Sequence, residues 1–113
     1  MSTDKYLDRE YHYSRYNCSH FVNEVWMDLT GECIIGICQS FIQGSDGDFT
    51  KRIRERIRLE KPETPCVAIM QTDQKIMHAG VFIDGDILHL TESGVQRDSI
   101  DRLRVFSKLS FYK

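Results

Sequence analysis

One cysteine in this sequence lies where a nucleophile could be activated. Cys18 directly follows Asn17, a residue type that commonly caps helices. The apolar residues that then recur at helical spacing are Phe21, Val22, Val25, Trp26 and Leu29. The N-terminus of a helix carries partial positive charge, which stabilises a thiolate over a thiol. The spacing therefore predicts that Cys18 begins a helix and is a reactive nucleophile.

A cysteine nucleophile needs an imidazole base, and often a third group that orients this base. His78 and His89 flank Asp84-Gly85, a strong signal for a two-residue hairpin turn. Counting outward from that turn, Gly80 pairs with His89, and His78 points to the same face as Gly80. The two histidines are then diagonal neighbours, close enough for their rings to meet. The pattern predicts a Cys–His site in which these two histidines supply the base and the group that orients it.

The remaining cysteines and histidines have less reactive settings. Cys66 lies in an apolar run, and Cys33 and Cys38 lie beside isoleucines, which predicts small core residues. The spacing of Cys33 and Cys38 also allows a zinc site, although no second tight pair follows. Without a signal peptide, reduced thiols are the default expectation. We expect His12 and His20 to be poorly placed, the latter because it points away around the helix.

Predicted helices precede predicted strands in this chain, which indicates an α+β fold. The length of 113 residues suits one domain over residues 1–113. We expect a helix over residues 17–29 that stops at Gly31, and a second over 46–60 with Ile53 and Ile57 on its apolar side. The expected strands cover residues 66–71, 76–83 and 87–91, with further strands from 94–96 and 105–112.

Charge and hydropathy limit the partners and the location. The formal net charge of -2 implies no polyanion partner, and the basic run at residues 51–58 fits a solvated surface better than a nucleic-acid site. No apolar run approaches the length of a membrane span, and the N-terminus lacks the apolar core of a signal peptide. We expect a protein that is cytoplasmic as made and acts there, or that leaves by phage, lysis or a dedicated secretion machine.

Two segments resemble motifs of the NlpC family of papain-like cysteine peptidases. Tyr-Asn-Cys-Ser-His-Phe-Val at residues 16–22 resembles the family's nucleophile motif, Asp-Cys-Ser-Gly-Phe-Val. The segment 78–89 resembles the family's His-Val-Gly-Ile-Tyr-Ile-Gly-Asp-Gly and the strand that follows it. The resemblance covers residues 11–112 and is closest to short members of phage or prophage type.

The resemblance implies a papain-like fold, in which a nucleophile helix packs on an antiparallel β-sheet. It implies a catalytic triad of Cys18, His78 and His89 and requires no metal or cofactor. It suggests that the substrate is a peptide bond in the stem peptides of bacterial peptidoglycan. The residues that it places in substrate binding are Asn17, Ser19 and Tyr13, with Asn17 standing where the family commonly has Asp. Tyr11 is the alternative to Tyr13 as the match to the family's site tyrosine.

Three other functions fit the same residues. The scaffold could serve as a thiol acyltransferase or lipid hydrolase, or as an amidase or deamidase that acts on proteins. It could also be a non-catalytic structural or binding module of a phage. The sequence carries no signal for an oligomeric state.

Overall fold

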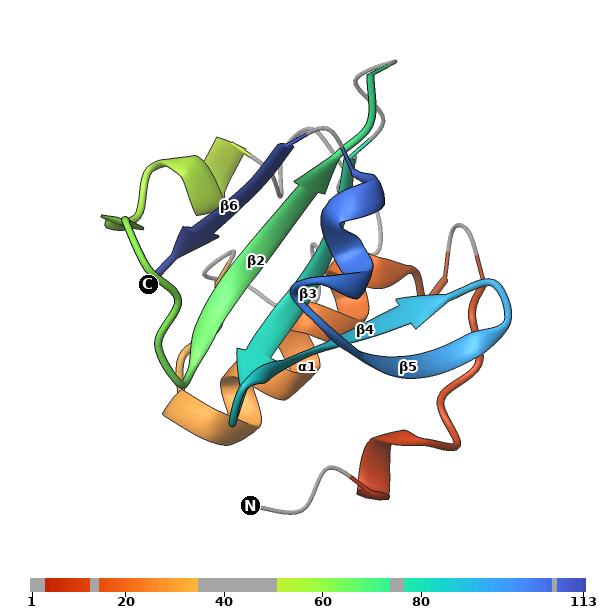
Figure 1. Cartoon of the computed structure of the whole chain (residues 1–113). Helices are drawn as coiled ribbons and strands as arrows, with labels where there is room; N and C mark the ends of the chain where they lie inside the picture. The colour runs from red at the N-terminus through yellow and green to blue at the C-terminus, as the bar shows by residue number, and fades with distance from the viewer. Residues whose placement is uncertain (1–3, 13–14, 35–50, 74–76, 107) are drawn as a thin grey trace.

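The computed structural model describes residues 4–12, 15–34, 51–73, 77–106 and 108–113. It has an α+β fold, as predicted: a long helix packs against an antiparallel sheet whose strand order is β1-β6-β2-β3-β4-β5 (Figure 1). Among the described residues, no helix is both long and apolar enough to cross a membrane.

The helix α1 spans Cys18–Thr30, as the sequence predicts. Asn17 caps its N-terminus in a capping box: the Asn17 side-chain oxygen accepts from the backbone N–H of His20, and the His20 ring accepts from the backbone N–H of Asn17. Gly31 ends the helix with a φ of 76°, a left-handed conformation that costs glycine little. Local signals at both ends therefore determine where α1 begins and ends.

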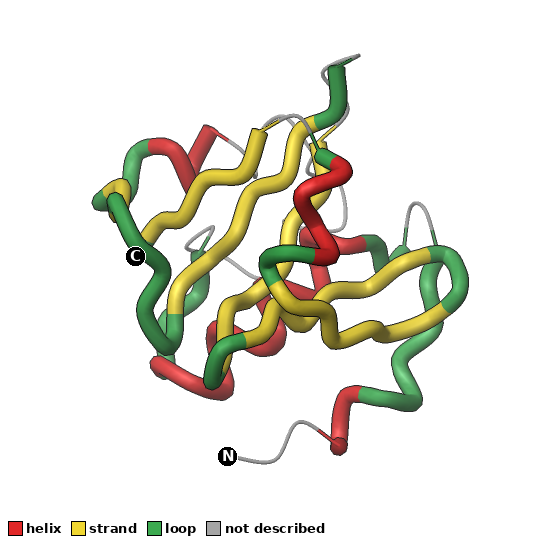
Figure 2. Tube along the Cα trace, viewed as in Figure 1, coloured by secondary structure: helices red, strands yellow, loops and turns green. Residues whose placement is uncertain are grey.

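Four of the strands follow one another as a meander. The strands are β1 Arg58–Leu59, β2 Cys66–Gln71, β3 Met77–Ile83, β4 Asp86–Thr91, β5 Gly94–Ser99 and β6 Lys108–Tyr112. After β5, the chain passes through the 3₁₀ helix η3, Arg102–Val105, and returns across the sheet so that β6 pairs with β2 (Figure 2). The prediction placed strands at the segments of β2 to β6, but it included neither β1 nor this return.

The sheet is covered on both faces. On one face, Ala79, Val81 and Ile83 of β3 lie in the same core cluster as Phe21, Val22, Val25 and Trp26 of α1. On the other face, Phe82 packs in a second cluster that includes Leu103 of η3. Because side chains alternate along a strand, His78 belongs to the Phe82 face, where its ring stacks on that of Phe106 at a centroid distance of 6.3 Å.

The prediction of a second helix over residues 46–60 is wrong at its C-terminal end. Residues 51–54 are helical, but the chain then turns and enters β1, while residues 46–50 lie outside the described residues. Ile53 is fully buried, whereas Ile57 is 72% exposed. The backbone N–H and C=O of Ile57 both bond to Lys113, so pairing with the C-terminal end of the chain outweighs the helical pattern.

The N-terminal segment is held against α1 by polar side chains. The hydroxyl of Tyr6 donates to Asp28 at 2.7 Å, and the guanidinium of Arg9 donates to both carboxylate oxygens of Glu24. Tyr6 is fully buried, with its ring edge-on to that of Phe21. These contacts hold the segment that leads to Tyr11 beside the start of α1.

Candidate active site

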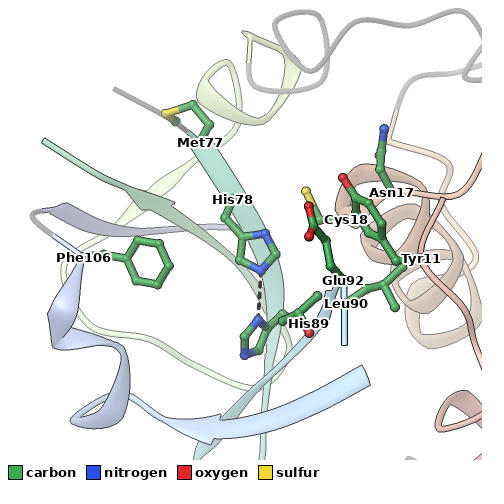
Figure 3. Close-up of a pocket in the computed structure, with 10 residues that line it drawn as sticks. Tyr11, Asn17, Cys18, Met77, His78, His89, Leu90, Glu92 and Phe106 are labelled. Carbon is green, nitrogen blue, oxygen red and sulfur yellow. Dashed lines mark hydrogen bonds between the residues drawn. The ribbon is translucent and has the colours of Figure 1, made fainter. Parts of the chain in front are cut away.

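A pocket of about 420 Å³ opens where the start of α1 meets the ends of β3 and β4 (Figure 3). Its size lies within the range typical of small-molecule and substrate sites. The described residues that line it are Tyr11, Asn17, Cys18, Met77, His78, His89, Leu90, Thr91, Glu92 and Phe106. The predicted nucleophile and both predicted histidines thus border one cavity, although they come from three different elements.

The position of Cys18 follows from how α1 begins. Cys18 is the first residue of the helix, and Asn17 before it also lines the pocket. The side-chain oxygen of Asn17 accepts from the backbone N–H of Ser19 at 3.0 Å. The cap therefore holds the positive end of the helix dipole at the pocket wall, where it favours negative charge on the Cys18 sulfur.

The hairpin of β3 and β4 has the predicted register. Asp84 and Gly85 form the two-residue turn, with φ values of 51° and 94°, and Ile83 pairs with Asp86. The ladder continues to Val81 opposite Leu88. The prediction that places His78 and His89 on one face rests on this register, and the contact between their rings confirms it.

Gly80 lets the two histidines come together. A Cβ atom at Gly80 would lie 2.9 Å from the backbone oxygen of Leu88 and 3.0 Å from the Cβ of His89, closer than ordinary packing allows. The missing side chain brings the strands close enough for Nε2 of His78 to lie 2.9 Å from Nδ1 of His89. Figure 3 draws this contact and shows the other ring nitrogen of His78 on the side where Cys18 lies.

A third strand adds a carboxylate that the sequence analysis missed. Nε2 of His89 lies 2.8 Å from Oδ2 of Asp98 on β5, and Asp98 is diagonal to His89 because it pairs with Ile87. The other carboxylate oxygen lies 3.3 Å from Nη1 of Arg102. Counting outward from the Glu92–Ser93 turn would have predicted this neighbour, as the count from Asp84-Gly85 predicted the pair of histidines.

The surroundings of His78 keep its ring neutral. Burial and the neighbouring His89 lower the pKa of His78 from 6.5 to about 4. The hydrogen bond from His89, with a further contribution from Arg102, lowers the pKa of Asp98. Near neutral pH the site therefore holds an uncharged imidazole that can accept a proton and a carboxylate that stays ionised.

The other predicted site residues have mixed outcomes. Ser19 is buried and is not among the residues that line the pocket; its backbone N–H serves the helix cap. Tyr13 lies outside the described residues, whereas Tyr11 lines the pocket. His20 takes part in the capping box, and His12 accepts from the backbone N–H of Arg15 at 3.1 Å, so neither of them borders the pocket.

The expectation that all thiols are reduced is wrong for Cys33, which is disulfide-bonded. The expectation rested on the absence of a signal peptide, and that says nothing about which sulfurs lie within bonding distance. A disulfide sulfur is not a thiolate ligand, so Cys33 is not available for the zinc alternative. Cys38 lies outside the described residues. In the described part of the chain, no group of three or more His, Cys, Asp or Glu side chains is arranged to hold a metal ion.

No significant match links the chain to a known protein. Neither a family model, nor a curated protein, nor a solved structure is similar to it.

The turn between β4 and β5 contributes further pocket residues that sequence reasoning did not identify. Glu92 lines the cavity from this turn, and Thr91 lines it from the last position of β4. Figure 3 shows the Glu92 carboxylate directed into the cavity. Phe106, which follows η3, closes the opposite side. Single residues of these types carry no catalytic signal in a sequence, and only the return of the chain toward β6 brings Phe106 to the site.

Proposed function

We propose that this protein is a cysteine hydrolase of the papain-like NlpC type that cleaves amide bonds. The observation that carries the proposal is the pocket that Cys18, at the N-terminus of α1, shares with the hydrogen-bonded pair His78 and His89. A thiol at a helix start, an imidazole and a group that orients this imidazole are the parts that nucleophilic catalysis by cysteine requires.

The reaction we propose proceeds through a thioester. His78 takes the proton of the Cys18 thiol, and the thiolate attacks the carbonyl carbon of the substrate amide. The protonated His78 then gives its proton to the leaving amine as the C–N bond breaks. A water molecule, deprotonated by His78, attacks the thioester and releases the acid and the free thiol. The lowered pKa of about 4 means that the resting His78 is unprotonated near neutral pH, so a ring nitrogen is free of the proton that it must accept.

Two further groups assist the reaction: one stabilises the negative charge of the tetrahedral intermediate, and the other orients the base. We assign stabilisation of the tetrahedral oxyanion to the backbone N–H of Cys18, because it lies at the first position of α1 beside the pocket. His89 holds the ring of His78 through the 2.9 Å contact between them. Its burial, with 4% of its surface exposed, restricts it to that orientation.

The proposed substrate class is the stem peptide of bacterial peptidoglycan. This part of the proposal comes from the resemblance of residues 16–22 and 78–89 to the NlpC motifs. The pocket adds one consistent feature: it offers the carboxylate of Glu92 and no lysine or arginine among its described lining residues. Such a lining suits a substrate that carries an amine near the scissile bond.

The decisive experiment is digestion of purified peptidoglycan with the protein, followed by mass spectrometry of the soluble fragments. We expect new free amines and stem-peptide fragments with the wild-type chain and none with Cys18→Ala. An intact cell wall with the wild-type chain would contradict the proposed substrate. Amidase or deamidase activity on proteins, or thioester exchange with an acyl donor, would then identify which related activity the site performs.

A further inference from the structure

Asp98, His89 and His78 form a continuous hydrogen-bonded row across three neighbouring strands. The row runs from Oδ2 of Asp98 to Nε2 of His89 over 2.8 Å, and from Nδ1 of His89 to Nε2 of His78 over 2.9 Å. Asp98 is shielded, with 13% of its side chain exposed, and the His89 side chain is 5% exposed. Water therefore competes weakly for these contacts, and each donor or acceptor in the row needs a hydrogen-bond partner from within the row.

The chemistry of the carboxylate determines where the protons lie in this row. An ionised carboxylate can only accept, so Nε2 of His89 must carry a hydrogen. In neutral His89 the other nitrogen, Nδ1, is then a bare acceptor, and Nε2 of His78 must donate to it. Neutral His78 consequently has a lone pair on Nδ1, the nitrogen on the Cys18 side of the ring in Figure 3.

We propose that Asp98 is a positioning residue that fixes both imidazoles in the tautomer with hydrogen on Nε2. This inference rests on the proposed function, because it assigns Nδ1 of His78 as the atom that takes the Cys18 proton. After that transfer the row stays intact: protonated His78 still donates through Nε2, and the carboxylate of Asp98 balances the new positive charge. The order of the groups therefore keeps His78 hydrogen-bonded in the same orientation before and after it takes the proton.

Asp98→Asn tests the inference because it changes the proton pattern with little change in shape. Arg102, which lies 3.3 Å from Oδ1 of Asp98, can only donate and therefore favours the amide oxygen on its own side. The amide NH₂ then faces Nε2 of His89, which must accept. That exchange moves the hydrogen of His89 to Nδ1 and, in turn, the hydrogen of His78 to its own Nδ1.

The matched control is Asp86→Asn. Asp86 lies on β4, and one of its carboxylate oxygens is 3.0 Å from Nε of Arg97, so the same substitution removes a carboxylate that contacts an arginine in the same part of the sheet. Asp86 does not line the pocket. Any effect of lost surface charge should therefore appear in both variants, whereas a change of tautomer should appear only in Asp98→Asn.

The experiment combines long-range ¹H–¹⁵N correlation spectra of the imidazoles with steady-state kinetics, both at pH 8, where ordinary histidines are neutral. We expect wild-type His78 and His89 to carry hydrogen on Nε2, and Asp98→Asn to shift both toward the Nδ1 form. We expect kcat to fall at least about 10–100-fold, the range typical when the groups that orient metal-binding histidines are mutated, with KM little changed. Asp86→Asn should match the wild type in both measurements.

The wild-type spectrum alone overturns the inference if it places the hydrogen of His78 on Nδ1, so the test does not depend on how well Asp98→Asn folds. Unchanged tautomers and kcat in a folded Asp98→Asn variant overturn it as well. The predicted tautomers in a chain that hydrolyses no amide substrate would support the role of Asp98 in the row and contradict the proposed function.

Discussion

Two elements of this molecule begin with a buried cysteine, and their settings differ. Cys18 is the first residue of α1 and is 8% exposed, while Cys66 is the first residue of β2 and is fully buried. Cys18 borders the pocket that also holds His78 and His89. Cys66 lies in an apolar cluster with Phe82 and other core residues, where burial raises the pKa of its thiol.

The comparison teaches that burial alone does not decide what a cysteine can do. A strand end offers no aligned dipoles, because the dipoles of a sheet alternate, so nothing near Cys66 favours the thiolate. The start of a helix offers N–H groups that all point the same way. What distinguishes a candidate nucleophile from a core cysteine is therefore the type of element that it begins and whether a cavity lies beside it.

The largest expected effect comes from removing each thiol in turn. Cys18→Ala should lower kcat/KM for the amide substrate by about 10⁴-fold or more, because the residue is the proposed nucleophile. Cys66→Ala should keep its activity but lose about 1–2 kcal/mol of stability, because it leaves a small cavity in the core. Hydrolysis assays and urea denaturation of both variants measure this contrast. Full activity in Cys18→Ala would remove the basis of the proposed mechanism.

The next effect concerns the two histidines beside Cys18. His78→Ala should cost about 10²–10⁴-fold in kcat, because it removes the proposed base from both proton transfers. His89→Gln should retain more activity than His89→Ala, since glutamine can still accept a hydrogen bond from the ring of His78. His12→Ala is the control, because His12 is exposed and does not border the pocket. Equal losses in His12→Ala and His78→Ala would point to a structural effect.

Alkylation compares the two thiols directly. In the folded protein at pH 7.5, iodoacetamide should modify Cys18 at least about 100-fold faster than Cys66, because Cys66 reacts only when the core opens. Peptide mapping by mass spectrometry gives both rates from one sample. In urea the two rates should converge. Similar rates in the folded state would show that the setting of Cys18 does not activate it.

The smallest effect is a pH dependence of stability that originates at the pocket. The folded state lowers the pKa of His78 from 6.5 to about 4, so between these values the unfolded chain binds more protons. Stability should be unaffected by this group above pH 6.5 and should fall by about 1–2 kcal/mol between pH 6.5 and pH 5. The carboxyl of Asp98, whose pKa is also lowered, contributes only at more acidic pH.

Urea denaturation at several pH values measures this dependence. His78→Asn should flatten the curve between pH 6.5 and pH 5, because it removes the group whose pKa changes on folding. A slope that remains in His78→Asn would assign the pH dependence to another residue.

Local sequence signals were sufficient for α1 and for the β3–β4 hairpin. Asn17 and Gly31 act within one turn of the helix, and the Asp84-Gly85 turn sets the register of the strands beside it. Because side chains alternate along a strand, that register was enough to predict the contact between His78 and His89. These predictions required no knowledge of how distant parts of the chain meet.

Distant contacts decided the rest. Residues 51–60 have a helical pattern of apolar residues, yet pairing between Ile57 and Lys113 draws the chain into β1. Phe106 reaches the pocket only because the chain returns through η3 to place β6 beside β2. Cys18 borders the same pocket as the histidines because α1 packs against the sheet. The sequence by itself determined the candidate site residues and their local geometry, because caps and turns act over a few residues. Only the tertiary structure decided which of these residues share a cavity, because that depends on contacts between segments far apart in the chain.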